Sequence, residues 1–426
     1  MKSKKRNWLK LSLQGGTLLA IVAFILYGIF FGEQRADPEA YCPFGGLQAI
    51  GSYLHNNSLA CSMSMAQIMM GVVLAVGVIL FSKLFCGYLC PLGTIGEYLG
   101  KGGRKLKMNF DLKPGGIADR GLRIVKYGLL FVVFYMSVSS SELFCKNFDP
   151  YYAMATGFKG EITAWMTSIS IVLLFLGSFF IKMFWCKYIC PLGALSNIFK
   201  FTITFVGLLL LFWLLGWAGL PSAWVWALGA ACLIGYLYEM IYLRSKVFPL
   251  LRIVRDAESC NGCGSCTKKC PYHIDLKELK TVRHIDCTLC GDCVSSCPKG
   301  SLQVGGKKSL RWLPGILTIV LFVLALILGN QWELPTIDER WGNTEQVGEM
   351  KTFEMEGLTS IKCYGSSKAF SDKMQKVPGV YGVKTFVKRH AVVISYDPAQ
   401  TNEDKIREVI FIPTIMKFSN PEPQVD

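Results

Sequence analysis

The 426-residue sequence predicts a polytopic α-helical membrane protein with a cysteine-rich insert and a small C-terminal α/β domain. Three observations predict this class. The composition is 52% hydrophobic, the apolar residues gather into runs long enough to cross a bilayer, and many of the 17 cysteines recur at fixed spacings. An ordinary soluble protein would not combine these features.

Seven apolar runs are predicted to be membrane spans, because a helix needs about 20 apolar residues to cross the hydrocarbon core. The first run follows a basic N-terminus as in a signal peptide, but no small-residue cleavage site follows it, so we expect an uncleaved anchor. The runs cover about residues 11–32, 64–84, 124–140, 164–184, 202–219, 224–243 and 313–330.

The net charge of +15 is explained by topology, and we expect no nucleic-acid partner. Lysine and arginine gather before the first run, after the second and sixth runs, and before the seventh, whereas loops 33–62 and 141–163 carry few. Basic loops stay on the cytoplasmic side of a membrane. The sequence therefore predicts an inner-membrane protein with a cytoplasmic N-terminus and an extracytoplasmic C-terminus.

A repeated cysteine motif ends two of the apolar runs. FCGYLCPLG covers residues 85–93, and WCKYICPLG covers residues 185–193 with Cys, Tyr, Cys, Pro, Leu and Gly in register. In C-x3-C the two sulfurs lie one helical turn apart on one face, and the following proline disfavours helix at the second cysteine. We expect both spans to end there and to present four thiols at the cytoplasmic membrane face, namely Cys86, Cys90, Cys186 and Cys190.

These four thiols are a candidate metal or redox site, provided that an internal repeat of spans 1–2 and 3–4 brings them to one axis. An additional Fe–S cluster, a copper site and a redox dithiol remain open. Lys83 and Lys182 lie about one helical turn before the first cysteine of each motif. They either favour the thiolates or only reach toward the membrane interface.

The insert after the sixth run contains SCNGCGSCTKKCP and DCTLCGDCVSSCP, two copies of C-x2-C-x2-C-x3-C-P. This is the pattern of a bacterial ferredoxin with two [4Fe–4S] clusters, in which the fourth cysteine of each run binds the other run's cluster. Structural zinc also uses C-x2-C, but not eight cysteines in two such runs. The pattern assigns Cys260, Cys263, Cys266 and Cys297 to one cluster and Cys287, Cys290, Cys293 and Cys270 to the other.

Paired C-x3-C-P motifs followed by a two-cluster ferredoxin resemble the membrane ferredoxin-type proteins of the NapH and NosR kind, over about residues 1–310. The resemblance implies electron transfer between a cytoplasmic or membrane donor and an extracytoplasmic acceptor, with redox partner proteins on both sides. A related architecture in CcoG-type oxidase-assembly proteins implies the alternative, copper reduction or copper handling. The sequence shows no flavin-binding domain and no stand-alone active site, so we expect an electron carrier or an oxidoreductase subunit.

Three further cysteines fall in the loops predicted to face outward, namely Cys42, Cys61 and Cys145. Cys42 and Cys145 follow the first and third spans and so occupy similar places in the two repeats. The sequence is compatible with two arrangements. The three cysteines form one disulfide and leave one thiol over, or they form an outer metal or redox site that mirrors the inner one.

The C-terminal residues 350–416 predict a β-α-β-β-α-β domain after a polar linker. KCYGSSKAFSDKMQKVPGVYGVKTF resembles the heavy-metal-associated domain of copper chaperones. That family holds Cu(I) with C-x-x-C, whereas Cys363 is followed here by Ser366 at the second position, so a docking module and Cu(I) handling through Cys363 both remain open. The expected domain order is membrane domain 1–250, ferredoxin insert 257–305, final span 312–331 and C-terminal domain 350–416.

Overall fold

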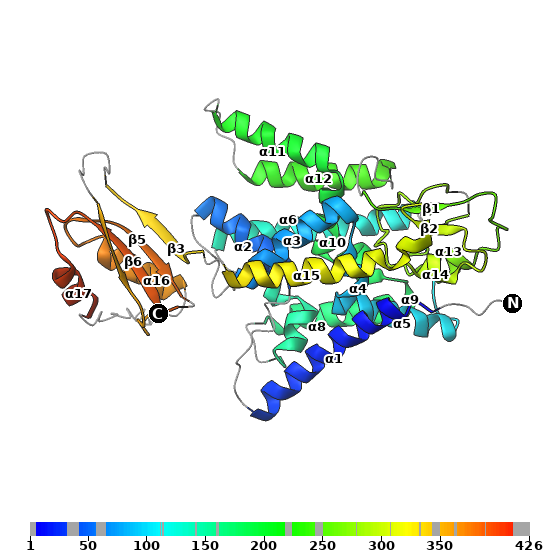
Figure 1. The fold of residues 1–426 in the computed structure, drawn as a ribbon, viewed down its shortest axis with the longest axis horizontal. Coiled ribbons are helices and arrows are strands. Elements are labelled where there is room, and N and C mark those ends of the chain that lie inside the picture. Colours follow the sequence, from blue (N-terminus) through cyan, green and yellow to red (C-terminus); the bar gives the residue numbers. More distant parts are fainter. Residues whose placement is uncertain are drawn as a thin grey trace, which may run out of the picture. The chain divides into compact units, whose positions relative to one another are not determined.

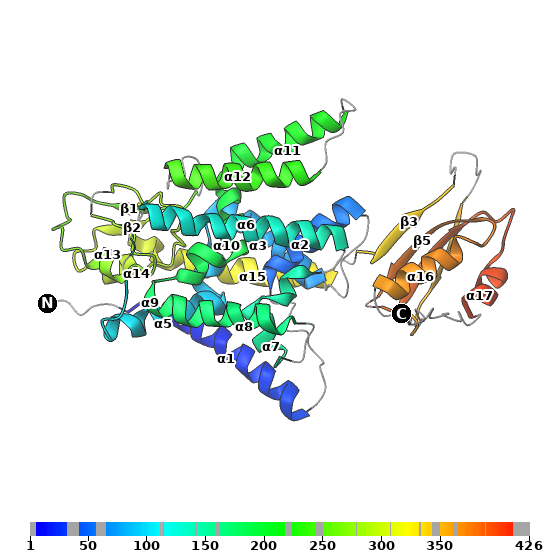
Figure 2. The ribbon, with the colours of Figure 1, turned by 180° about the vertical axis from the view of Figure 1, so that it is seen from behind.

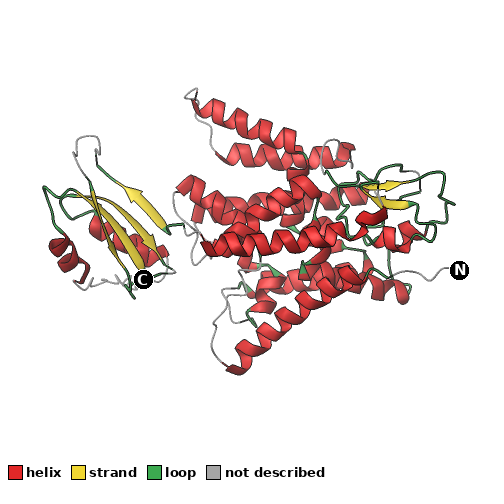
Figure 3. Cartoon of the chain, in the orientation of Figure 1, coloured by secondary structure: helices red, strands yellow, loops and turns green. Residues whose placement is uncertain are grey.

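The structure, a computed structural model, forms two compact units, residues 1–52 with 63–332 and residues 53–62 with 333–426. The first is a helical unit with a small cysteine-rich domain, and the second is an α/β unit (Figures 1 and 3). The structure describes residues 6–31, 42–56, 65–110, 112, 115–140, 143–158, 162–217, 224–242, 250–277, 279–306, 308–331, 334–342, 350–361, 364–387 and 389–411.

Helices account for most of the first unit. Short 3₁₀ turns at Phe144–Asn147 and Lys308–Trp312 and π-helical turns at Leu173–Gly177 and Trp185–Ile189 interrupt the pattern. The α-helices outside the cysteine-rich domain are α1 Trp8–Phe31, α2 Pro43–Asn56, α3 Met65–Phe81, α4 Leu84–Tyr88, α5 Pro91–Lys105, α6 Ile117–Ser140, α7 Pro150–Ala155, α8 Ala164–Val172, α9 Ser178–Phe180, α10 Pro191–Lys200, α11 Thr202–Trp217, α12 Trp224–Tyr242 and α15 Leu313–Gln331.

Every apolar run expected to span the membrane contains a helix, which supports the membrane class. Within the described residues, α1, α6, α12 and α15 are long and apolar enough to cross a bilayer, and a fifth candidate forms if α10 and α11 count as one span. Those two helices meet at an angle of 91°, and the helices at 65–81 and 164–180 are shorter. Seven crossings and their orientation therefore stay a prediction.

Small residues let helices in this unit approach closely, as is common in membrane bundles. A Cβ built on Gly46 of α2 would lie 2.0 Å from the carbonyl oxygen of Gln67 on α3. A Cβ on Gly329 of α15 would lie 2.4 Å from the Cα of Ala66. Helices α2 and α15 thus both pack tightly against α3.

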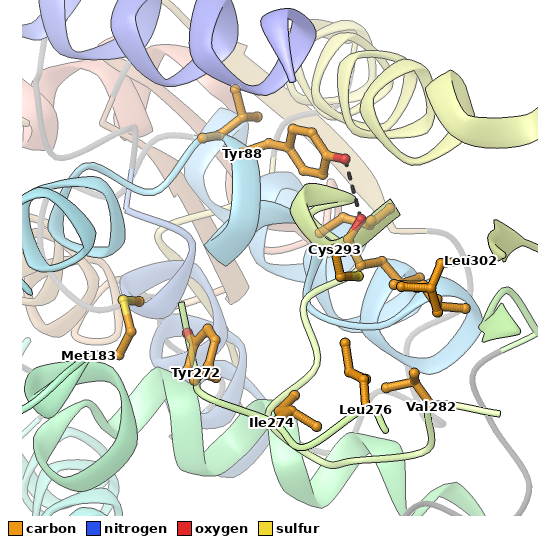
Figure 4. Close-up of a cluster of buried hydrophobic side chains, with 12 residues drawn as sticks. Tyr88, Met183, Tyr272, Ile274, Leu276, Val282, Cys293 and Leu302 are labelled. Atoms are coloured by element: carbon orange, nitrogen blue, oxygen red, sulfur yellow. Dashed lines mark hydrogen bonds between the residues drawn. The ribbon is translucent and has the colours of Figure 1, made fainter. Parts of the chain in front are cut away.

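The cysteine-rich domain contains β1 Ile253–Arg255, α13 Ser265–Lys269, α14 Asp292–Ser296 and β2 Leu302–Val304. Strands β1 and β2 pair antiparallel, with Ile253 opposite Val304. The domain lies beside the start of α1, and both ribbon views agree on this placement (Figures 1 and 2). Its apolar core includes Tyr88 of α4, so the domain packs on the helices rather than being loosely tethered (Figure 4).

A buried ion network joins the helices to this domain. Arg123 of α6 donates to Asp119 at 3.1 Å, to Asp286 of the insert at 2.8 Å and to Glu239 of α12. Lys126 contacts the same carboxylate of Glu239 at 2.8 Å. All five side chains are almost completely buried, so each charge depends on its partners.

The second unit is an antiparallel sheet in the order β3-β5-β6-β4, with two helices. Strand β3 occupies a stretch that the sequence analysis assigned to a polar linker, so the domain begins before residue 350. Ile337 is buried in β3 and lies opposite Thr385. The sequence did not predict this strand because three charged residues follow Ile337, so apolar and polar residues do not alternate. The expected last strand, after residue 411, lies outside the described residues. The elements are β3 Ile337–Arg340, β4 Lys351–Met355, α16 Tyr364–Met374, β5 Val380–Phe386, β6 Ala391–Tyr396 and α17 Glu403–Phe411.

Replacing Arg123 with alanine is expected to lower the free energy of unfolding by about 3–5 kcal/mol, because it leaves buried carboxylates without their main counterion. The measurement is denaturant unfolding of the protein in detergent. Arg120→Ala, at an exposed position on the same helix, is the matched control and should change stability little. Equal effects of the two substitutions would show that the network does not stabilise the fold.

Candidate functional site

The four cysteines that the spacing assigns to the first cluster line one pocket beside β2. Three of them surround the start of α13, and Cys297 follows α14. Gly264 precedes α13 with φ +67°, a left-handed conformation that glycine adopts without strain. The side chain of Cys263 is exposed, so this set of thiols is accessible from the surface.

The four cysteines assigned to the second cluster also come together, but below the surface. The pKa of the Cys293 thiol is raised well above its usual value by burial and by three neighbouring cysteines, Cys290, Cys270 and Cys287. Burial likewise raises the pKa of Cys270 to about 11. Thiols held this way stay protonated unless a cationic group replaces the proton, which is what iron ligation does.

The loop that carries the second set is bound to the membrane helices by several hydrogen bonds. Asn7 donates to the Cys290 carbonyl at 2.7 Å, and Ser82 donates to the Cys287 carbonyl at 2.7 Å. Tyr88 donates to the Leu289 carbonyl at 3.3 Å (Figure 4). These contacts satisfy backbone carbonyls between the cysteines and fix the loop against α3 and α4.

A second buried ion pair reinforces this attachment. The ammonium of Lys10 on α1 lies 2.6 Å from Asp292, beside Cys293, and 2.7 Å from Glu97 on α5. Burial alone would raise the pKa of Glu97, but Lys10 and Lys101 outweigh it and hold the pKa at about 2. The carboxylate is therefore ionised at any physiological pH.

The sequence analysis expected each preceding span to end at its C-x3-C-P motif, but the preceding helix ends before the motif begins. Helix α3 ends at Phe81, Ser82 takes φ +83°, and Cys86 lies on the separate short helix α4. Cys90 and Cys190 are extended, with ψ of 119° and 114°. The prolines after them open the next helices, so the second cysteine of each motif is an N-cap residue rather than part of the span.

All four motif sulfurs nevertheless meet at one cavity of about 70 Å³. That is several times the roughly 10–15 Å³ that one water molecule requires. Burial and the neighbouring thiols Cys86, Cys186 and Cys190 raise the pKa of Cys90. The expected convergence of the four cysteines is therefore seen in the structure.

The two lysines that precede the motifs differ in position. Lys83 lines the cavity, donates to the Gly193 carbonyl at 3.3 Å and lowers the pKa of Cys86, against the larger effect of burial. Lys182 instead lies 3.4 Å from His273 of the insert. Of these two lysines, it is therefore Lys83 that favours thiolates in the cavity.

Two of the outward-loop cysteines also line this cavity. Cys42 lies 3.9 Å from the Asp149 carboxylate, and Cys145 is buried nearby. Both therefore lie at the cavity of the paired motifs, and the choice between a disulfide and an outer metal or redox site stays a prediction. Cys61 and Cys363 lie outside the described residues.

Tyr272 connects the second cluster set to the cavity, and sequence reasoning missed it. It lies two residues after Cys270 and lines the cavity. Burial raises the pKa of Cys186 well above its usual value, and a hydrogen bond with Tyr272 acts against that rise. Gly87 of the first motif is also in close contact with the insert, because a Cβ there would lie 3.1 Å from Thr288. The cavity and the second cluster set are therefore adjacent.

No group of three or more His, Cys, Asp or Glu side chains in the described part of the chain lies close enough to hold a single metal ion. This includes the described cysteines of both ferredoxin sets. A cubane places its thiolates on different irons and so needs them farther apart than the ligands of one ion. The donor sets, thiols in loops with nearby amide N–H groups, fit Fe–S clusters.

Comparison with known proteins identifies both cysteine regions. A family described as a 4Fe-4S binding domain matches residues 63–109 and 163–203. A family described as a 4Fe-4S dicluster domain matches residues 252–298. No solved structure matches the chain.

Three similar proteins are named as an electron transport protein, a regulatory protein and a ferredoxin-type protein. YccM of Escherichia coli, whose name describes an electron transport protein, is 30% identical over 257 residues, 59% of this chain and 58% of YccM. Regulatory protein NosR of Stutzerimonas stutzeri is 34% identical over 127 residues, 29% of this chain and 17% of NosR. Ferredoxin-type protein NapH of Haemophilus influenzae is 31% identical over 119 residues, 27% of this chain and 38% of NapH.

The chain thus spans less than two thirds of the length of each of these relatives. The predicted resemblance to membrane ferredoxin-type 4Fe–4S proteins is confirmed by the matched domains and relatives. The matched family ranges end at residue 298, so the likeness of the C-terminal domain to heavy-metal-associated domains stays a prediction.

Replacing Gly87 with valine is expected to push the insert away from the cavity, because the new side chain would collide with Thr288. The measurement is the rate of proteolytic cleavage in the insert of the purified protein, which should rise several-fold. Gly102→Val on α5 is the control, since a Cβ there meets nothing closer than 4.0 Å. Equal cleavage rates in both variants would contradict the close packing of insert and motif.

Proposed function

We propose that this membrane ferredoxin-type protein carries single electrons along three centres in a row. The observation that carries the proposal is the adjacency of the buried second cluster set and the four-cysteine cavity, with Tyr272 between them. An Fe–S cluster supplies reversible one-electron chemistry when bound. The accessible first set is the port for a soluble partner, and the buried second set passes electrons to the cavity.

The third centre is proposed to be an Fe–S cluster held by Cys86, Cys90, Cys186 and Cys190. The match of a 4Fe-4S binding domain to the residues around both motifs supports this assignment. The four thiolates are also suitable ligands, because soft sulfur donors favour Fe–S clusters. The cavity has room for a group of several atoms.

The surrounding residues would set the reduction potential of this centre. The ammonium of Lys83 adds positive charge, and the Gly93 amide donates to the Cys90 sulfur at 3.5 Å. Both favour the more negative, reduced state of a cluster. The apolar walls keep water away and hold the cofactor in a low-dielectric site.

The direction of transfer follows the predicted topology. The basic loops place the ferredoxin insert on the cytoplasmic side, and the loops that carry Cys42 and Cys145 on the outer side. Electrons would enter from a cytoplasmic or membrane donor and leave to an extracytoplasmic partner. The C-terminal domain, on the same outer side, would serve as a docking module for that partner.

The copper alternative has less support. The names of the similar proteins refer to electron transport, ferredoxin and regulation. Within the described residues no thiol group is arranged for one ion, and Cys363 is not among them.

Replacing Cys186 with serine is expected to leave the ferredoxin clusters intact and to stop electron flow across the membrane. Purified protein is reconstituted in vesicles that contain ferricyanide, and dithionite is added outside. The rate of internal ferricyanide reduction should fall by more than about tenfold, because the third centre of the path is lost.

The control is Cys232→Ser, which changes a buried thiol on α12 that does not line the cavity. This variant should conduct like the wild type. Undiminished flow through the Cys186 variant would rule out the cavity as part of the path.

A further inference from the structure

We propose that Cys42 is an additional ligand to one iron of the centre in the cysteine cavity, beside that iron's motif thiolate, contributed from the segment that precedes the matched 4Fe-4S binding domain. This inference rests on the proposed function, since it requires a cluster in the cavity. The proposed site then extends beyond the paired C-x3-C motifs to a ligand from the loop predicted to lie on the outer side of the membrane.

Cys42 begins a third copy of the turn that carries the inner ligands. The sequence Cys42-Pro-Phe-Gly has the same Cys-Pro-x-Gly pattern as Cys90-Pro-Leu-Gly and Cys190-Pro-Leu-Gly. In each copy the proline is the first residue of a helix of at least ten residues, α2, α5 or α10. The repeat is visible in the sequence, but the copies are far apart along the chain. The structure is needed to show that they meet at one cavity.

The backbone amides after each cysteine act on its sulfur in the same way. Burial raises the pKa of the Cys42 thiol to about 12 and the Asp149 carboxylate adds to that rise, while the amides of Gly45 and Phe44, which face the sulfur, act in the opposite direction. Gly93 does the same for Cys90, and Gly193 for Cys190. Amides that face a sulfur favour thiolate and metal ligation over an inert thiol.

The three turns face the same cavity. Cys42 lines it together with the four motif cysteines, and Cys42 and Cys190 are close enough to affect each other electrostatically. The N-termini of three helices therefore surround one space, and their dipoles favour a bound group with negative charge. An Fe–S cluster with thiolate ligands is such a group.

One further side chain points to a bound group on this side, and a second holds Cys42 at the cavity. Trp185 lines the cavity, is 2% exposed, and its indole N–H has no acceptor among the described residues. Such a buried donor normally has a partner, and a cluster sulfide would supply one. Asp149 accepts the hydrogen bond from Cys42 at 3.9 Å and is itself fixed by the Tyr151 amide at 2.9 Å.

The test compares Cys42→Ser with Cys232→Ser in protein purified anaerobically. Iron and sulfide per chain, Mössbauer and EPR spectra, and a redox titration are measured for both variants and the wild type. We expect the Cys42 variant to lose the third centre or to change its spectrum and midpoint potential. The ferredoxin signals should persist and so report that the protein is folded, and the Cys232 variant should match the wild type.

The proposal is overturned if the third centre of the Cys42 variant has the wild-type iron content, spectrum and potential. If Cys42→Ser does not fold, Cys42→Asp keeps an iron-binding side chain at this position. It should fold with a shifted potential, and an unshifted potential would equally overturn the proposal. Wild-type protein with only about eight irons would instead refute the cluster of the proposed function itself.

Discussion

The arrangement of redox sites depends on two charge contacts between the membrane helices and the cysteine-rich insert, one buried and one partly buried. Arg123 pairs with Asp286, next to Cys287, and Lys10 pairs with Asp292, next to Cys293. Buried charges of this kind are costly unless every partner is in place, so they specify one position of the insert. That position puts the second cysteine set, rather than the exposed first set, against the cavity of the paired motifs.

The cavity is formed by repeated Cys-Pro turns, each of which precedes a helix. A proline after a cysteine ends one helical segment and begins another, which leaves the cysteine at a helix N-terminus. When several such turns meet, sulfur atoms and the amides that face them gather in one space, and apolar side chains shield that space from water. Such a space would suit the anionic cluster proposed for this cavity, since helix N-termini favour negative charge.

The ferredoxin insert and the membrane class could be predicted from sequence, because cysteine spacing and long apolar runs leave few alternatives. The meeting of the four motif cysteines could not, because the rotation of each helix about its axis decides whether the sulfurs face one another. The docking of the insert could not, since it depends on pairs such as Lys10 with Asp292, which are 282 residues apart. A signal for it was present, because ionisable residues in apolar helices, such as Lys10 and Glu239, are usually functional or paired. The placement of Cys42 and strand β3 likewise depends on contacts between segments distant in the chain.

The most direct test of the three-centre account is the iron and acid-labile sulfide content of the anaerobically purified full-length protein, measured together with its Mössbauer spectrum. Two ferredoxin cubanes and a third cluster predict about twelve irons per chain. About eight irons, all in the two ferredoxin sites, would leave the cavity without a cluster and contradict the account.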